Sequence, residues 1–264
     1  MIIDSQVHCY EANSPQRPWH SVPDWRPSAT GDEVVAEMDS LGVDGAIFIS
    51  AHSLYQFDSS YALEVQRAHP GRFGLVKPID PDDPAAEDRI MIRKRDAALA
   101  ANDPGISRII RAATRLGFPV NLSCAGNLKG AAAILERYPD TRFIIDHLGL
   151  LQPRKVEPEP WADLPQLLAL AHHTNVVVKV SGVCMLSKQP YPYADMWDPL
   201  ARVFDTWGID RCLWGTDWTR TFMAVKYEQA FKSFYLSERL SESERAMLMG
   251  GACAKAYGWS PVRT

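Results

Sequence analysis

The chain has 264 residues, of which 28 are Lys or Arg and 32 are Asp or Glu, and its formal net charge is −4 at pH 7. Charges of both signs are interspersed, which argues against nucleic acid or an anionic membrane as the partner. The expected partners are therefore small molecules, or further copies of the chain in a homo-oligomer. No apolar run approaches the ~20 residues that span a bilayer.

The cysteines and the start of the chain indicate the cellular compartment in which the protein is expected to work. The five cysteines are an odd number without a CxxC spacing, which is typical of free thiols in a reducing compartment. The N-terminus shows no basic stretch followed by an apolar one, as a secretory signal would. We therefore expect a cytoplasmic protein.

Apolar runs alternate with amphipathic segments along the whole chain. Thr30 to Glu33 has the form of a capping box, and Asp103-Pro104 is an N-cap followed by proline at the first helical position. Strands are expected over residues 1–8, 44–50, 72–79, 89–93, 119–124, 142–149, 175–181 and 211–216. Helices are expected over residues 30–41, 59–69, 103–116, 127–138, 163–173, 196–207, 227–235 and 241–257.

Eight strands that alternate with helices predict a single (β/α)₈ barrel domain over residues 1–264. The turns that enter strands are tight, whereas the segments that leave strands one, six and seven are long, so the site should lie at the C-terminal face. One region departs from the alternation of strands and helices, because too few residues separate the strands at 72–79 and 89–93 for a crossover helix.

Three of these strands end in residues that can do chemistry. The first ends at His8, the sixth runs into His147, and the eighth runs into Asp217. In barrels of this type the catalytic side chains stand at the C-terminal ends of strands. The alternatives are structural: both histidines could be core residues that make their hydrogen bonds within the fold, and Asp217 could only cap the following helix.

Four motifs together resemble the "amidohydrolase 2" branch of the amidohydrolase superfamily. Asp4 to His8 resembles the D-x-H-x-H motif of its first strand with Gln6 in place of the first histidine. Residues 145–149 and 214–218 resemble its sixth- and eighth-strand signatures, and residues 250–258 its closing helix. Within the branch the likeness is to the lactonases of 2-pyrone-4,6-dicarboxylate and of sugars, and more distantly to non-oxidative decarboxylases.

The resemblance also bears on a metal cofactor. Zinc-binding members use two first-strand histidines, a further histidine and the eighth-strand aspartate, but here Gln6 replaces one histidine and strand 119–124 has none. Zinc requires at least three strong protein ligands. We therefore expect no metal; the alternative is one divalent metal such as zinc, held by His8, His147 and Asp217.

The resulting hypothesis is a hydrolase of a small, carboxylated cyclic ester. Asp217 would act as general base on water, while His8, His147 and Gln6 would polarise the lactone carbonyl. The candidates for holding the substrate are Lys77, Arg89, Lys179, Arg220, His52 and Tyr191, although Lys179 could instead be paired inside the barrel. Two alternatives are a metal-dependent decarboxylase that releases CO₂ and a non-catalytic barrel that binds a ligand.

Overall fold

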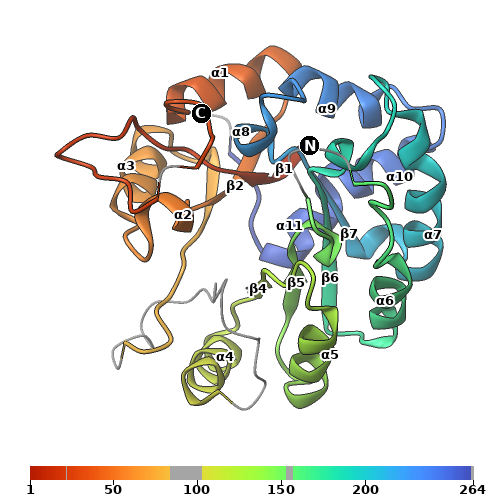
Figure 1. Cartoon of the computed structure of the whole chain (residues 1–264), viewed down its shortest axis with the longest axis horizontal. Coiled ribbons are helices and arrows are strands. Elements are labelled where there is room, and N and C mark those ends of the chain that lie inside the picture. Colours follow the sequence, from red (N-terminus) through yellow and green to blue (C-terminus); the bar gives the residue numbers. More distant parts are fainter. Residues whose placement is uncertain (22, 84–102, 153–156, 263–264) are drawn as a thin grey trace.

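The computed structural model describes residues 1–21, 23–83, 103–152 and 157–262. Within these ranges seven parallel strands alternate with helices that lie around them (Figure 1). The strands form one sheet in the order β1-β2-β3 and a second in the order β4-β5-β6-β7. Their bounds are β1 Ile3–Val7, β2 Gly45–Ile49, β3 Phe73–Val76, β4 Val120–Leu122, β5 Phe143–Ile145, β6 Val176–Ser181 and β7 Cys212–Gly215.

The two sheets meet where β1 lies beside β7. The backbone N–H of Asp217 donates to the carbonyl of Gln6 at 2.9 Å, and the buried carboxylate of Asp4 accepts from Thr216 N at 2.9 Å and Thr216 Oγ1 at 2.6 Å. A Cβ at Gly215 would stand 2.7 Å from the hydroxyl of Ser5, so glycine is needed for this approach. The described strands therefore follow one another around a curved wall in barrel order, and the strand predicted at 89–93 lies outside the described residues.

The longer helices follow the predicted segments closely. Thr30 caps α1 through a capping box with Glu33, Gly42 ends it at φ 74°, and the Asp103 side chain accepts from Ile106 N at the start of α4. Their bounds are α1 Gly31–Leu41, α3 Ser60–Ala68, α4 Pro104–Leu116, α5 Leu128–Arg137, α6 Leu164–Ala169, α7 Trp197–Trp207 and α9 Tyr227–Tyr235. Two short helices, α2 His52–Tyr55 and α8 Trp218–Thr221, were not predicted.

The helix predicted over 241–257 is corrected by the structure. It consists of α10 Glu242–Ala246, a π-helical segment Met247–Gly251 and α11 Ala252–Tyr257. A Cβ at Gly250 would lie 2.4 Å from the carbonyl oxygen of Met1, so glycine lets this segment pass against the start of the chain. The wider π turn interrupts the α-helical hydrogen-bond ladder at this contact.

None of the helices in the described part of the chain is both long enough and apolar enough to cross a bilayer.

Candidate active site

His8 lies one residue beyond β1, where its ring is fixed by the neighbouring strand. Its Nδ1 lies 2.7 Å from the carbonyl oxygen of Ile49, and since a carbonyl only accepts, Nδ1 carries the hydrogen. The backbone N–H of His8 donates to Thr219 Oγ1 at 3.0 Å. The remaining nitrogen, Nε2, faces Asp217 Oδ1 at 3.4 Å, and both side chains are buried.

Asp217 follows β7 with a left-handed backbone, φ 50°, which is uncommon for residues other than glycine. Its Oδ2 accepts from Arg220 Nε at 2.5 Å, whereas the buried Oδ1 has no hydrogen-bond partner. Burial alone would raise the pKa of this carboxyl, but the positive charge of Arg220, together with the interactions with His147 and His8, outweighs burial and holds the pKa well below its usual range. Asp217 is therefore a carboxylate with one oxygen free to bind a reactant.

His147 stands in a strained turn rather than in a strand. The sequence predicted a strand over 142–149, but β5 ends at Ile145, and His147, Leu148 and Gly149 have φ values of 54°, 56° and 64°. Two consecutive left-handed residues other than glycine, His147 and Leu148, store strain of the kind found at functional sites, whereas Gly149 adopts this conformation without strain. The turn brings His147 Nδ1 within 2.9 Å of Ser181 Oγ and 3.9 Å of Asp217 Oδ2. Burial lowers the pKa of His147 to about 4, so its ring is neutral at pH 7.

Arg220, in α8, connects this helix to the loop after β5. Besides its bond to Asp217, its guanidinium donates to the side-chain oxygen and, at 3.3 Å, to the backbone carbonyl of Gln152. The Gln152 amide in turn donates to the Ser181 carbonyl at 2.6 Å. The Arg220 side chain is 24% exposed, so this predicted substrate-binding residue reaches both the catalytic carboxylate and the surface.

Gln6 and Lys179 lie inside the barrel wall. The Lys179 ammonium donates to Gln6 Oε1 at 2.8 Å and pairs with Asp146 Oδ1 at 3.0 Å, and its side chain has no exposed surface. The placement of Lys179 at the mouth of the barrel as a carboxylate-binding residue is therefore wrong. Its alternating position on β6 turns it inward, and burial of an ammonium requires such a partner.

The other predicted substrate-binding residues are dispersed. Lys77 follows β3 and lines a cavity between β3 and β4 together with Asn121 and Tyr257. His52 begins α2, where its ring packs edge-on against Phe57 at 5.0 Å. Tyr191 is 40% exposed and contacts the ring of Tyr193. Arg89 lies outside the described residues.

The long loop after β1 covers His8, as its length suggested. Trp25 lies 5.7 Å from the His8 ring and 5.3 Å from the Tyr10 ring, measured between centroids. The Tyr10 hydroxyl donates to the carbonyl of Thr219 at 3.1 Å, which ties this loop to α8. Sequence reasoning missed both Trp25 and Gln152, because each stands in a loop without periodicity.

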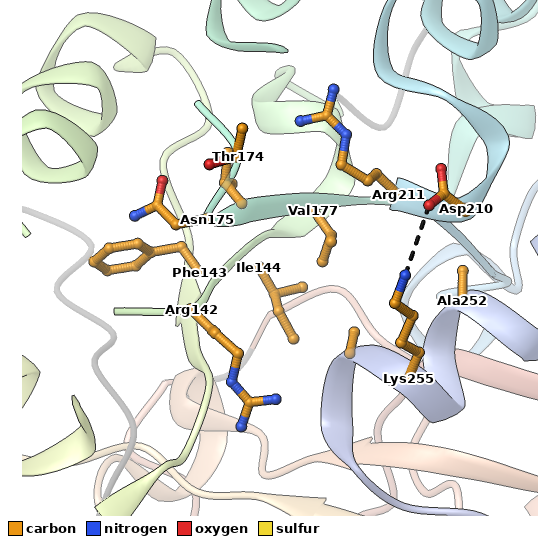
Figure 2. Close-up of a pocket in the computed structure, with 12 residues that line it drawn as sticks. Arg142, Phe143, Ile144, Thr174, Asn175, Val177, Asp210, Arg211, Ala252 and Lys255 are labelled. Atoms are coloured by element: carbon orange, nitrogen blue, oxygen red, sulfur yellow. Dashed lines mark ion pairs between the residues drawn. The ribbon is translucent and has the colours of Figure 1, made fainter. Parts of the chain in front are cut away.

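A cavity of about 430 Å³ lies away from these residues, at the opposite end of the strands (Figure 2). It is lined by the starts of β5 and β6, by the turn that precedes β7 and by α11, and its lining includes the charged residues Arg142, Asp210 and Lys255. None of the predicted site residues lines it. Because barrel chemistry is done at the C-terminal ends of strands, we place the candidate site around His8, His147 and Asp217.

The parallel barrel-ordered strands and the histidine and aspartate groups at their ends define the class of protein. The model of the amidohydrolase family matches residues 3–259. The chain therefore belongs to the amidohydrolase family, as its motifs predicted.

Two curated relatives are named for lactone hydrolysis. The chain is 27% identical over 205 residues to a 4-sulfomuconolactone hydrolase of Hydrogenophaga intermedia. This match covers 73% of this chain and 66% of the relative. The chain is also 33% identical over 142 residues to an L-fucono-1,5-lactonase of Burkholderia ambifaria, and this match covers 50% of this chain and 46% of the relative. The matches thus span about two thirds and about half of the lengths of these relatives.

Solved structures share the fold along nearly the whole chain. An amidohydrolase of Burkholderia multivorans with bound zinc has a TM-score of 0.77 at 20% identity, and the match covers 98% of this chain and 99% of that one. A probable 2-pyrone-4,6-dicarboxylic acid hydrolase of Acinetobacter baumannii with bound citric acid has a TM-score of 0.78 at 18% identity, with the same coverage. These likenesses confirm the predicted barrel fold class.

One structural neighbour contains bound zinc, but the donor atoms of this chain do not suit that ion. His8 Nε2 and Asp217 Oδ1 are 3.4 Å apart, but His147 Nδ1 is engaged with Ser181, and the Gln6 oxygen is engaged with an ammonium. The Arg220 guanidinium also contacts Asp217 and repels a second cation. Within the described ranges no group of three or more His, Cys, Asp or Glu is arranged to hold a metal. The residues present do not fit a zinc site.

We expect the purified protein to contain well under one equivalent of zinc or manganese, because only two strong donors converge on one point. Elemental analysis by mass spectrometry checks this, with His8→Asn as the matched variant. A stoichiometric metal in the wild type that is lost in His8→Asn would contradict the expectation.

Proposed function

We propose that this protein hydrolyses small lactones that carry a carboxylate, without a metal ion. The observation that supports this most is the buried Asp217–His8 pair, in which Asp217 Oδ1 is unbonded while Oδ2 is held by Arg220. The two curated relatives are named for the same bond cleavage, the opening of a cyclic ester.

In the proposed reaction Asp217 Oδ1 accepts a hydrogen bond from the attacking water. The water oxygen bonds to the lactone carbonyl carbon, the ring C–O bond breaks, and the ring oxygen leaves as an alcohol. Since the pKa of Asp217 is well below its usual range, the carboxylate alone is a weak base. His8 Nε2 lies 3.4 Å away, and the hydrogen of this ring is on Nδ1, so Nε2 is the atom that holds the water proton until the ring oxygen takes it.

The carbonyl oxygen becomes negatively charged during this attack. His147, whose neutral ring is partly exposed, and the amide of Gln6 are the groups that we assign to stabilise it. Donors placed in advance where negative charge develops lower the barrier without reorganising during the reaction.

Arg220 is the group that we assign to the substrate carboxylate. Its guanidinium is partly exposed and stands beside Asp217, and a guanidinium fork suits a carboxylate better than an ammonium does. Two of its five N–H groups remain after the bonds to Asp217 and Gln152.

The test compares two lactones of the same ring, one with and one without a ring carboxylate. For Arg220→Gln we expect kcat/KM on the carboxylated lactone to fall about 10- to 100-fold more than on the neutral one, the usual effect of one charged hydrogen bond. Effects of Arg220→Gln that act through Asp217 are common to both substrates, so they cancel in the ratio of the two kcat/KM values. Arg142→Gln, at the opposite end of the strands (Figure 2), is the control. An unchanged ratio in Arg220→Gln would contradict carboxylate recognition, and CO₂ release would identify a decarboxylase.

The cysteines support a further proposal, that the protein works in the cytoplasm. All five are free and buried. Burial raises the pKa of the Cys124 and Cys184 thiols to about 12, so these thiols remain protonated and unreactive in a reducing compartment.

A further inference from the structure

A buried positive charge lies directly beneath the candidate site. The Lys179 side chain has no exposed surface, and its ammonium contacts Gln6 Oε1 at 2.8 Å and Asp146 Oδ1 at 3.0 Å. The ring of Tyr257 lies 5.7 Å from the ammonium, a distance typical of a cation–π contact. This charge is fully desolvated, so its position is fixed by these three partners.

The partners of Lys179 are themselves held in place. Asp146 Oδ1 also accepts from the Asn121 amide at 3.2 Å, and the Asn121 amide bonds to the Tyr257 hydroxyl at 2.9 Å. β4, β6 and α11 thus all contribute to one buried network around the ammonium. These mutual hydrogen bonds fix the arrangement of the side chains around the ammonium.

The network is one layer below the residues assigned to the reaction. Side chains two positions apart on a strand face the same side, which places Lys179 beneath Ser181, the partner of His147. Gln6 is two residues before His8 along the chain and contacts the Lys179 ammonium. Asp146 directly precedes His147 in the strained turn. Each of these three residues therefore adjoins a group of the site.

The ammonium also decides how the Gln6 amide is oriented. An ammonium donates hydrogen bonds and accepts none, so the oxygen of the Gln6 amide must face Lys179 and the NH₂ group must face away from it. Among the described residues the Gln6 side chain makes only this hydrogen bond. Its NH₂ group is thus available as a donor to a bound molecule.

We infer that Lys179 is a positioning residue, which turns the Gln6 amide so that its NH₂ group donates to the lactone carbonyl oxygen. In this chain a glutamine oriented by a buried ammonium thus stands where the family motif has a histidine. The inference rests on the proposed lactone hydrolysis. A purely structural Lys179 would stabilise the barrel without any coupling to Gln6.

The test removes the charge pair as a unit, because Lys179→Met alone would remove the ammonium that contacts the buried Asp146 carboxylate. In Lys179→Met/Asp146→Asn we expect kcat to fall about 10²- to 10³-fold, the effect of losing one oxyanion donor, with little change in KM. Gln6→Met should lower kcat by about the same factor in the wild type. In the Lys179→Met/Asp146→Asn background, Gln6→Met should lower kcat little further. The matched control is Lys255→Met/Asp210→Asn, an exposed ion pair of 3.7 Å at the other end of the strands (Figure 2), which should leave kcat unchanged.

A second readout does not need activity. The ¹⁵N–¹H signals of the Gln6 amide, identified by their loss in Gln6→Met, should shift or broaden in Lys179→Met/Asp146→Asn and stay unchanged in the control pair. Unchanged Gln6 signals in Lys179→Met/Asp146→Asn would overturn the inference. Independent losses of kcat, in which Gln6→Met lowers kcat by the same factor with and without Lys179→Met/Asp146→Asn, would overturn it as well. If the wild type opens no lactone while the Gln6 signals still respond, the proposed function fails and the positioning of Gln6 stands.

Discussion

Asp217→Asn is expected to lower kcat for lactone opening about 10²- to 10⁴-fold, the usual range for loss of a catalytic acid or base. An amide fills the same space but removes the negative charge that orients water at Oδ1 and that stabilises a protonated His8. KM should change little, because Arg220 can still be held through Gln152. Steady-state kinetics on a carboxylated lactone measures both quantities.

Asparagine is the appropriate replacement at this position for a structural reason. Residue 217 has φ 50°, and asparagine tolerates this left-handed conformation far better than alanine does. Asp210→Asn changes an exposed carboxylate at the opposite end of the strands and serves as the control. If Asp217→Asn kept the wild-type kcat, Asp217 would have no part in water activation.

His8→Asn is expected to lower kcat by a similar factor, about 10²- to 10⁴-fold. Asparagine can still offer an N–H to the Ile49 carbonyl, but it provides no basic nitrogen beside Asp217 Oδ1. Loss of the ring should therefore remove the group that holds the water proton.

The pH dependence of kcat/KM distinguishes His8 from its neighbours. The pKa of Asp217 is far below its usual range and that of His147 is about 4, so neither residue changes charge above about pH 5. Loss in His8→Asn of an acid-side fall in kcat/KM that the wild type shows would assign acceptance of the water proton to His8. A fall that persists in His8→Asn would show that the proton is accepted elsewhere.

The features that could be predicted from the sequence are those set by periodicity. Continuous apolar runs gave the strands, and cap residues such as Thr30 and Asp103 gave the helix starts. The barrel class and the family were confirmed. His8 and Asp217 could be placed together because each directly follows an apolar strand, and the carboxyl ends of parallel strands meet at one face.

The features that could not be predicted depend on tertiary contacts. The left-handed turn at His147 has no local signal beyond Gly149, because the turn is held by contacts with Ser181 and with the barrel wall. Gln152 stands in a proline-rich loop without periodicity, and only the folded chain brings it to Arg220.

Lys179 shows a further limit. Strand alternation predicts which side of a sheet a lysine faces, but not how deep it lies within a barrel. Its depth here is set by Asp146 and Gln6, which are 33 and 173 residues away along the chain. A buried pair of this kind is recognised only when both partners are placed.

The most direct test of the account follows proton release after a carboxylated lactone is mixed with protein that has been treated with a chelator. Opening of the ring by water yields a carboxylic acid, whose ionised form releases one proton per turnover. We predict that the chelated wild type releases protons at the rate of the untreated protein, and that chelated Asp217→Asn releases them at least 10²-fold more slowly. Wild-type activity that disappears with the chelator and returns with zinc would contradict the account.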